Sequence, residues 1–257
     1  MAEPPYLNLF VYSDSLAFRR QGQSHDLAFL YPFVLRALIE ERIGVRVNLM
    51  LRGLPGATIA RLGASVVRDT GYFGGTGDAL NVAIIQGGIV DCAPHPFTYA
   101  LAPLLRAIPV LGQRLISFLV KHRRVLQLTW SYREVSESTF SKAYASIVAV
   151  LRRTRISPIA VGLPVPTPEV EYRSPGFSAS VMRYNELIRQ ALPEAFCDVE
   201  SRFTESMRGE FLLEDGHHLT VAGHRLYAEA LYPIVEGHVA RFGAEARRAN
   251  TQAGSSG

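Results

Sequence analysis

The sequence predicts a single α/β domain, a three-layer α/β/α sandwich built on a mainly parallel sheet of five strands. Short apolar runs alternate with longer amphipathic stretches, as in successive βαβ units. The apolar runs are rich in Val, Ile, Leu and Phe, which is typical of strands buried on both faces. The 257 residues, 48% of them hydrophobic and 19% charged, suit one globular core.

The expected elements alternate along the chain. The strands are expected at Tyr6–Tyr12, Val45–Leu51, Val82–Gln86, Pro158–Gly162 and Phe196–Val199. The helices are expected near 27–42, 57–69, 136–155, 178–191 and 221–240. The helix at 136–155 has the clearest apolar face, because its large apolar residues recur every three or four positions. Those residues are Phe140, Tyr144, Ile147, Val148 and Leu151.

Two further segments carry expectations of their own. Residues 164–177 contain four prolines and follow a strand, which predicts a loop on the side where open α/β sheets bind ligands. The domain is expected to span residues 1–243. Residues 244–257 end in Gln-Ala-Gly-Ser-Ser-Gly and are expected to form a disordered tail.

Charge and cysteine content narrow the class of protein. The net charge is +4 and the pI is near 9.2, which favours anionic partners such as a polyanionic glycan, a nucleotide-linked sugar or a lipid headgroup. The basic residues are scattered, so no nucleic-acid partner is expected. Cys92 and Cys197 lie far apart and indicate neither a disulfide framework nor a zinc site. The first residues lack a signal-peptide pattern, and the cytoplasm is the expected compartment.

The most apolar stretch is Tyr99–Val120, and Pro103, Arg106 and later breaks interrupt it. Because of these breaks, no uninterrupted apolar run reaches the roughly 20 residues that a membrane-spanning helix needs, so the stretch predicts one or two amphipathic helices. The favoured role is a cover over the sheet or the active site. Attachment to a membrane surface through the basic cluster at 121–124 is the alternative.

Candidate catalytic residues lie at the two ends of the chain. Ser15 follows the first strand, and a serine there becomes a nucleophile only when a base takes its proton. Asp215 precedes His218 by three residues, a spacing that brings a carboxylate to the imidazole. Taken separately, Ser15 fits a turn or helix cap, and Asp215 fits a turn. A metal site formed by Asp215, His217 or His218, and His224 is a third interpretation.

The order and spacing of four blocks resemble the SGNH (GDSL-like) hydrolases over residues 6–240. The segment Tyr12–Leu16 is similar to the GDSL block, with Ser13 in place of its usual glycine. Residues 215–219, Asp-Gly-His-His-Leu, followed by Ala-Gly-His, are similar to the closing DGxHL block. The resemblance implies the SGNH/flavodoxin-like fold and a triad of Ser15, Asp215 and His218. No Ser lies in G-x-S-x-G, so the α/β-hydrolase nucleophile elbow is absent.

The two intermediate blocks are expected to supply the oxyanion hole. Arg52–Thr58 resembles the glycine block, which makes the backbone N–H groups of Ser15 and Gly56 the implied oxyanion donors. Residues 88–91 resemble the GxND block, but Val90 stands at the asparagine position and its side chain cannot donate a hydrogen bond. The stretch Gly-Ile-Val-Asp-Cys-Ala-Pro at 88–94 also resembles a bacterial SGNH subgroup associated with polysaccharides and acylated metabolites.

The resemblance implies a serine carboxylic-ester hydrolase that works through an acyl-enzyme without cofactor or metal. The expected substrate is a small-molecule or glycan ester carrying a short acyl group, with acetyl preferred. Transfer of the acyl group to another hydroxyl, and a non-catalytic carbohydrate-binding or scaffold module, remain alternatives. Asn185 is expected to be a hydrogen-bonding polar group of the core. The residues expected as possible members of the substrate pocket are Asp14, Val90, Asp91 and His95.

Overall fold

Five parallel strands form the sheet of the computed structural model, which describes residues 6–20, 26–73, 79–95, 107–108, 111–129 and 132–254. The strands lie in the order β2-β1-β3-β6-β7, the 2-1-3-4-5 order of flavodoxin-like sheets when they are counted among themselves. This confirms the predicted fold class. The strands are β1 (Tyr6–Ser13), β2 (Arg46–Gly53), β3 (Leu80–Gln86), β6 (Ser157–Val161) and β7 (Phe196–Cys197).

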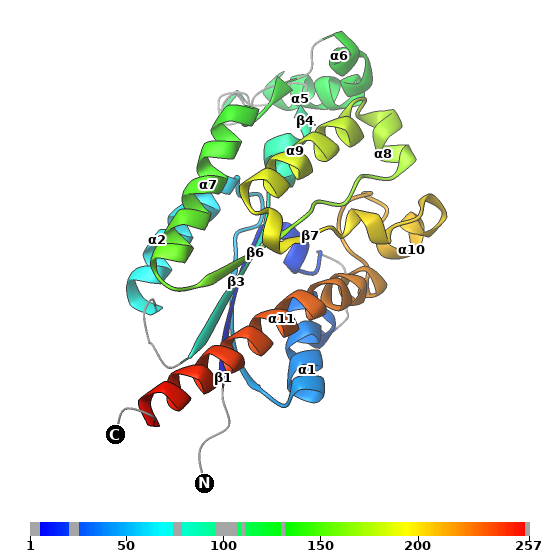
Figure 1. Ribbon diagram of the computed structural model, residues 1–257. Helices are drawn as coiled ribbons and strands as arrows, with labels where there is room; N and C mark the ends of the chain where they lie inside the picture. Colours follow the sequence, from blue (N-terminus) through cyan, green and yellow to red (C-terminus); the bar gives the residue numbers. More distant parts are fainter. Residues whose placement is uncertain are drawn as a thin grey trace.

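Helices cover both faces of this sheet. On one face α1 packs against α11, and on the other α2 packs against α7, which also contacts α9 (Figure 1). The three layers of the prediction are therefore present. The long helices are α1 (Tyr31–Ile43), α2 (Ile59–Phe73), α7 (Glu137–Arg153), α9 (Phe177–Ala191) and α11 (Val221–Gly254).

Burial follows the expected patterns. All of β3 is buried, as the central strand of a sheet covered on both faces should be. In α7 the five apolar residues at helical spacing are the buried ones, so the predicted register is confirmed. The side chain of Ser136 accepts a hydrogen bond from the N–H of Thr139 and caps this helix.

The segment at 164–177 is not only a loop. A helix, α8 (Pro168–Arg173), lies within it. Proline at the first position of a helix needs no hydrogen-bond acceptor and already has a helical φ. Glu169 and Glu171 in the first turn interact favourably with the positive end of the helix dipole and so stabilise the helix. One of the four prolines that predicted a loop, Pro168, therefore starts a helix.

The end of the chain also differs from expectation. Helix α11 continues to Gly254, so residues 244–254 are helical where a disordered tail is predicted. Between Gly243 and Gly254 the sequence contains no Gly or Pro and is rich in Ala and Arg, which are strong helix formers. Residues 255–257 lie outside the described residues.

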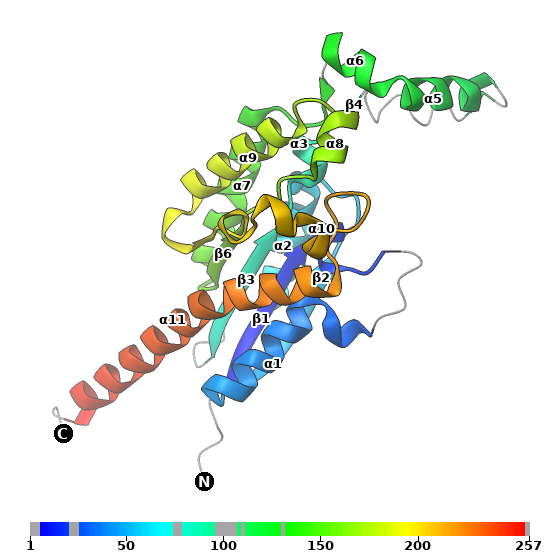
Figure 2. The same ribbon diagram turned by 90° about the vertical axis from the view of Figure 1, so that its right-hand side faces the viewer.

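A small extension follows β3 at its carboxyl end. It consists of α3 (Ile89–Cys92), the two-stranded antiparallel pair β4 (Pro94–His95) and β5 (Tyr132–Arg133), and the helices α5 (Leu111–Lys121) and α6 (Arg123–Thr129). Helices α5 and α6 project away from the sheet (Figure 2). The predicted amphipathic stretch is helical from Leu111, while 99–106, 109 and 110 lie outside the described residues. No helix in the described ranges is long and apolar enough to cross a membrane.

Candidate active site

Ser15 lies at the carboxyl edge of the sheet, where the strand order reverses between β1 and β3. Strand β1 ends at Ser13, and the 3-10 turn η1 (Ser15–Ala17) begins directly after Asp14. The Asp14 carboxylate accepts the N–H of Leu16 at 3.0 Å, and the Asp14 N–H donates to the Gln86 carbonyl at 3.1 Å. Ser15 is partly exposed while the residues on either side of it are buried. Such a switch point is where open α/β sheets bind ligands.

A tight turn before α11 carries the acid and the base. Asp215 Oδ1 accepts the N–H of His218 at 3.1 Å. Gly216 has φ +75°, and a Cβ there would lie 2.3 Å from Val170, so this position requires glycine for both its conformation and its space. The N–H of Leu213 donates to the His218 carbonyl at 2.8 Å and closes the turn.

These two regions meet in one hydrogen-bonded chain. His218 Nε2 lies 2.8 Å from Ser15 Oγ, and His218 Nδ1 lies 2.9 Å from Asp215 Oδ2. Because a carboxylate only accepts, Nδ1 carries the proton and Nε2 accepts from the serine hydroxyl. His218 is 3% exposed. The arrangement can therefore move a proton from serine to imidazole, which is what a serine nucleophile needs.

Electrostatics favour the ionised form of Asp215. Burial alone would raise its pKa, but the His218 hydrogen bonds and the nearby His217 together hold the pKa of Asp215 well below its ordinary value. Arg20 Nε lies 3.5 Å from Asp215 Oδ2, although Arg20 is half exposed. Sequence reasoning missed Arg20, since it lies in no recognisable motif and meets Asp215 only through the fold.

The metal interpretation fits these contacts poorly. Asp215, His217 and His218 do bring three ligand atoms within 4.8 Å of one another. Both ring nitrogens of His218 already have partners, and His217 Nδ1 donates to the Asp215 carbonyl at 2.9 Å. His224, the fourth residue of that interpretation, is fully buried and its Nδ1 accepts the N–H of Tyr31 at 3.3 Å.

The glycine loop after β2 lies beside the serine turn. The Leu54 N–H donates to the Ser13 carbonyl at 2.9 Å. The Ala57 N–H donates to the Leu54 carbonyl and closes a turn that contains Gly56. Gly56 is exposed and has φ +72°. Ser15 is the first residue of η1, so its N–H has no acceptor within that turn. The role of the Ser15 and Gly56 N–H groups as oxyanion donors stays a prediction.

Asp14 and Asp91 do not line a pocket as expected, because both carboxyl groups are fully buried. Both oxygens of Asp91 accept the N–H of Ile59, at 3.1 and 3.0 Å, which ties α3 to the start of α2. Burial raises the pKa of Asp14 to about 6 and that of Asp91 to about 7, and the charge of Asp14 adds to the shift at Asp91. The Asp14 carboxyl group therefore stabilises the turn that begins at Ser15, and the Asp91 carboxyl group stabilises the start of α2.

The other predicted pocket residues have separate surroundings. Val90 is partly buried in α3 and packs against the hydrophobic core. His95 lies on β4 opposite Tyr132. Burial, and to a smaller extent the positive charge of Arg123, lowers the pKa of His95 to about 4. That the side chain of Val90 or His95 takes part in substrate binding stays a prediction.

Two polar residues are structural. Asn185 accepts the N–H of Leu163 at 2.7 Å and donates to its carbonyl at 2.9 Å, which confirms the expected core role. Ser13, which replaces the usual glycine of the first block, is fully buried and donates through its hydroxyl to the side-chain oxygen of Gln86.

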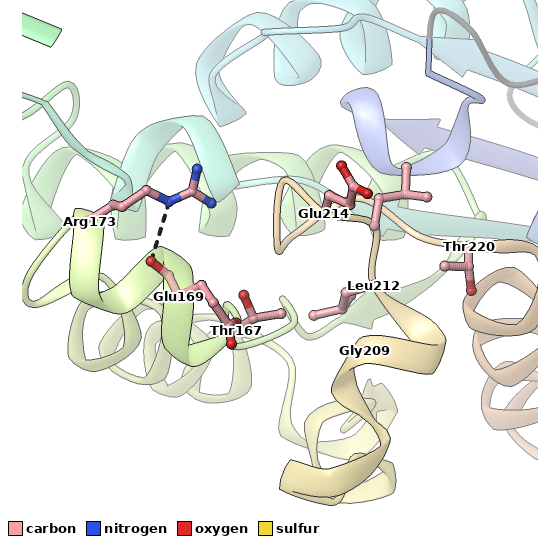
Figure 3. Close-up of a pocket in the computed structure, with 8 residues that line it drawn as sticks. Thr167, Glu169, Arg173, Gly209, Leu212, Glu214 and Thr220 are labelled. Carbon is pink, nitrogen blue, oxygen red and sulfur yellow. Dashed lines mark hydrogen bonds between the residues drawn. The ribbon is translucent and has the colours of Figure 1, made fainter. Parts of the chain in front are cut away.

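A pocket of about 560 Å³ opens between α8 and the loop that carries Asp215 (Figure 3). Glu169 and Arg173 lie on its α8 side, where the Arg173 Nε donates to the Glu169 carbonyl at 3.3 Å. Glu214 and Thr220 lie on the opposite side and flank the acid and base in sequence. The N–H of Thr167 donates to the Gly216 carbonyl at 3.2 Å, which joins the two walls. Polar and charged side chains therefore contribute to both walls.

Comparisons with known proteins identify solved structures with a similar fold. No family model and no curated protein sequence matches the chain. Among solved structures, an acetylxylan esterase from Geobacillus stearothermophilus, Axe2, has a TM-score of 0.58 at 17% identity, over 90% of this chain and 94% of that one. TesA has a TM-score of 0.58 at 14% identity, over 90% and 99% of the chains. The alpha/beta hydrolase LAE5 from the metagenome of Lake Arreo, Spain, has a TM-score of 0.60 at 19% identity, over 90% and 95%.

Proposed function

We propose that this chain is a serine carboxylic-ester hydrolase of the SGNH type. The observation that carries the proposal is the hydrogen-bonded chain from Ser15 through His218 to Asp215. Catalytic mutants of Axe2 replace a serine, an aspartate and a histidine, with the aspartate three residues before the histidine. The same three residue types and the same offset occur here.

The proposed reaction has two halves. His218 Nε2 takes the Ser15 proton while Oγ bonds to the ester carbonyl carbon, and the resulting imidazolium returns that proton to the departing alcohol oxygen as the C–O bond breaks. Water then attacks the acyl-enzyme, His218 takes a water proton, and the carboxylic acid leaves as the proton returns to Ser15. Asp215 holds the ring and stabilises the imidazolium in both halves.

Negative charge on the carbonyl oxygen is proposed to be held by the N–H groups of Ser15 and Gly56. Loss of one oxyanion donor costs about 2.7–4 kcal/mol in other serine enzymes. Val90 contributes no such donor, so slow turnover on simple esters is expected. Acyl transfer differs only in the acceptor that replaces water, and comparing products with and without added alcohols separates the two reactions.

The proposed substrate is a short acyl ester, such as an acetate, on a sugar hydroxyl. The pocket of Figure 3 supports a hydrophilic alcohol portion, because Thr167, Glu169, Arg173, Glu214 and Thr220 can donate to or accept from hydroxyl groups. Glu214 lines this pocket and directly precedes Asp215 in the sequence, while none of the three triad residues lines it.

Labelling with a fluorophosphonate tests the proposal. The probe loses fluoride when an activated serine attacks phosphorus, so the intact mass should rise by one adduct, and peptide mapping should locate the adduct at Ser15. Ser15→Ala should take up no label and lose turnover of 4-nitrophenyl acetate while keeping its far-ultraviolet circular dichroism. An unlabelled wild-type protein, or equal labelling of the variant, would contradict the proposed nucleophile.

A further inference from the structure

The helices α5 and α6 form a projecting arm, defined here as residues 111–129. Figure 2 shows the arm extending beyond the body of the domain. It exposes large apolar side chains in both helices. Those are Leu115 at 43%, Phe118 at 55%, Val125 at 62% and Leu128 at 64% exposure. Single exposed apolar residues are ordinary on a protein surface, but successive ones on two adjoining helices indicate a binding surface.

Among the described residues, polar contacts attach the arm to the domain. The Arg123 guanidinium donates to Ser174 Oγ at 2.7 Å, and the Arg124 guanidinium lies 3.8 Å from the centre of the Tyr172 ring. Gln127 Nε2 donates to the Pro94 carbonyl at 2.8 Å. All three contacts come from α6, so the base of the arm is fixed while the apolar side chains of α5 remain on the surface.

The arm also lies in a segment without acidic residues. No aspartate or glutamate occurs between Asp91 and Glu134, whereas arginine and lysine recur there. On α5, Arg114 and Lys121 are exposed and seven residues apart, so they lie on one flank of the helix about 20° from each other. Phe118 lies next to that flank. An apolar stripe bordered by cations is the pattern of a helix that lies in a membrane interface.

We propose that the α5–α6 arm docks this protein on an anionic lipid surface. Such a surface offers an apolar layer for Leu115 and Phe118 and negative headgroups for Arg114 and Lys121 at the same time. A neutral apolar partner would leave the cations without compensation, and a purely anionic one would leave the apolar side chains in water.

Docking in this way has a consequence for the candidate active site. Strands β1 and β3 are parallel, so Ser15, after β1, and the arm, after β3, lie at the same edge of the sheet. The docked protein therefore turns its catalytic edge toward the lipid surface. This orientation fits an acylated substrate held in or near a membrane, although the docking itself does not depend on the proposed hydrolysis.

Vesicle flotation with the full chain tests the proposal. The probes are vesicles of phosphatidylcholine alone and of phosphatidylcholine mixed with phosphatidylglycerol. The protein should float with the mixed vesicles at low salt and much less with the neutral ones. Arg114→Gln/Lys121→Gln should weaken binding by about thirtyfold, since each cation near such a surface contributes about a factor of five. Phe118→Asp should weaken binding by at least about tenfold.

Matched variants control for charge and hydrophobicity elsewhere on the surface. Arg61→Gln/Lys142→Gln removes two exposed cations from α2 and α7, and Met182→Asp replaces an apolar side chain on α9 that is 57% exposed. Both should bind like wild type. Absence of binding to mixed vesicles, or equal binding by arm variants and controls, would overturn the proposal. Concentration-dependent self-association that Phe118→Asp abolishes, without vesicle binding, would instead assign the arm to a second copy of this chain.

Discussion

Replacing His217 and His218 one at a time gives a sharp test of the proposed catalysis, because the two residues are neighbours with different contacts. His218 bridges Ser15 and Asp215 through bonds of 2.8 and 2.9 Å, so His218→Ala removes both the proton acceptor and its link to the acid. The His217 ring donates one hydrogen bond, from Nδ1 to the Asp215 carbonyl, and within the described part of the chain it has no hydrogen bond to Ser15.

The expected magnitudes follow from those contacts. Loss of the base of a serine triad should lower kcat/KM by at least about 10⁴-fold, which corresponds to about 5.5 kcal/mol in the activation barrier. Loss of one ordinary hydrogen bond at His217 is worth about 1 kcal/mol, or about fivefold. Because Ser15 and His218 act as a unit, the double variant Ser15→Ala/His218→Ala should be no slower than the slower single variant.

The assay is the initial rate of 4-nitrophenyl acetate hydrolysis, with the spontaneous rate subtracted and the fold checked by circular dichroism. A loss at His217→Ala equal to or larger than the loss at His218→Ala would refute the assignment of the base. Additive losses in the double variant would show that Ser15 and His218 do not work on the same proton.

Four further outcomes are expected. Val90→Asn should raise kcat on a small activated ester by about tenfold with little change in KM, since a new donor acts on the developing oxyanion; an unchanged kcat in folded protein would speak against it. Gly53→Ala should lower the unfolding free energy by about 1–3 kcal/mol, because its Cβ would lie 1.7 Å from the Phe18 ring; a wild-type urea midpoint would contradict this. In Asp91, burial raises the folded pKa to about 7 from an ordinary value of 3.8, so its stabilisation is complete below about pH 4 and is lost as the pH rises through 7; Asp91→Asn should flatten that part of the stability profile, and an unaltered slope would refute the cause. Asn185→Leu should destabilise the protein by about 2–4 kcal/mol in thermal unfolding, since a buried N–H and carbonyl lose their partners, and it should leave fluorophosphonate labelling of the folded fraction intact.

Local patterns in the sequence determined the elements of this protein. The strands were predictable because apolar runs of that length are buried on both faces, and the face of α7 because its apolar residues share a helical period. The three-residue spacing between Asp215 and His218 was also predictable from the local sequence. It places both side chains in one turn without help from distant residues.

Only the tertiary structure decided how these pieces meet. Ser15 and His218 are 203 residues apart, and their contact depends on strand order and on two loops that local propensity does not position. The same holds for Arg20 beside Asp215, and for the burial of Asp14 and Asp91, which were expected as possible members of the substrate pocket. Proline signalled a loop at 168, but whether it begins a helix depends on what its neighbours can pack against. Sequence patterns report interactions among near neighbours, whereas burial and long-range contact are properties of the packed chain.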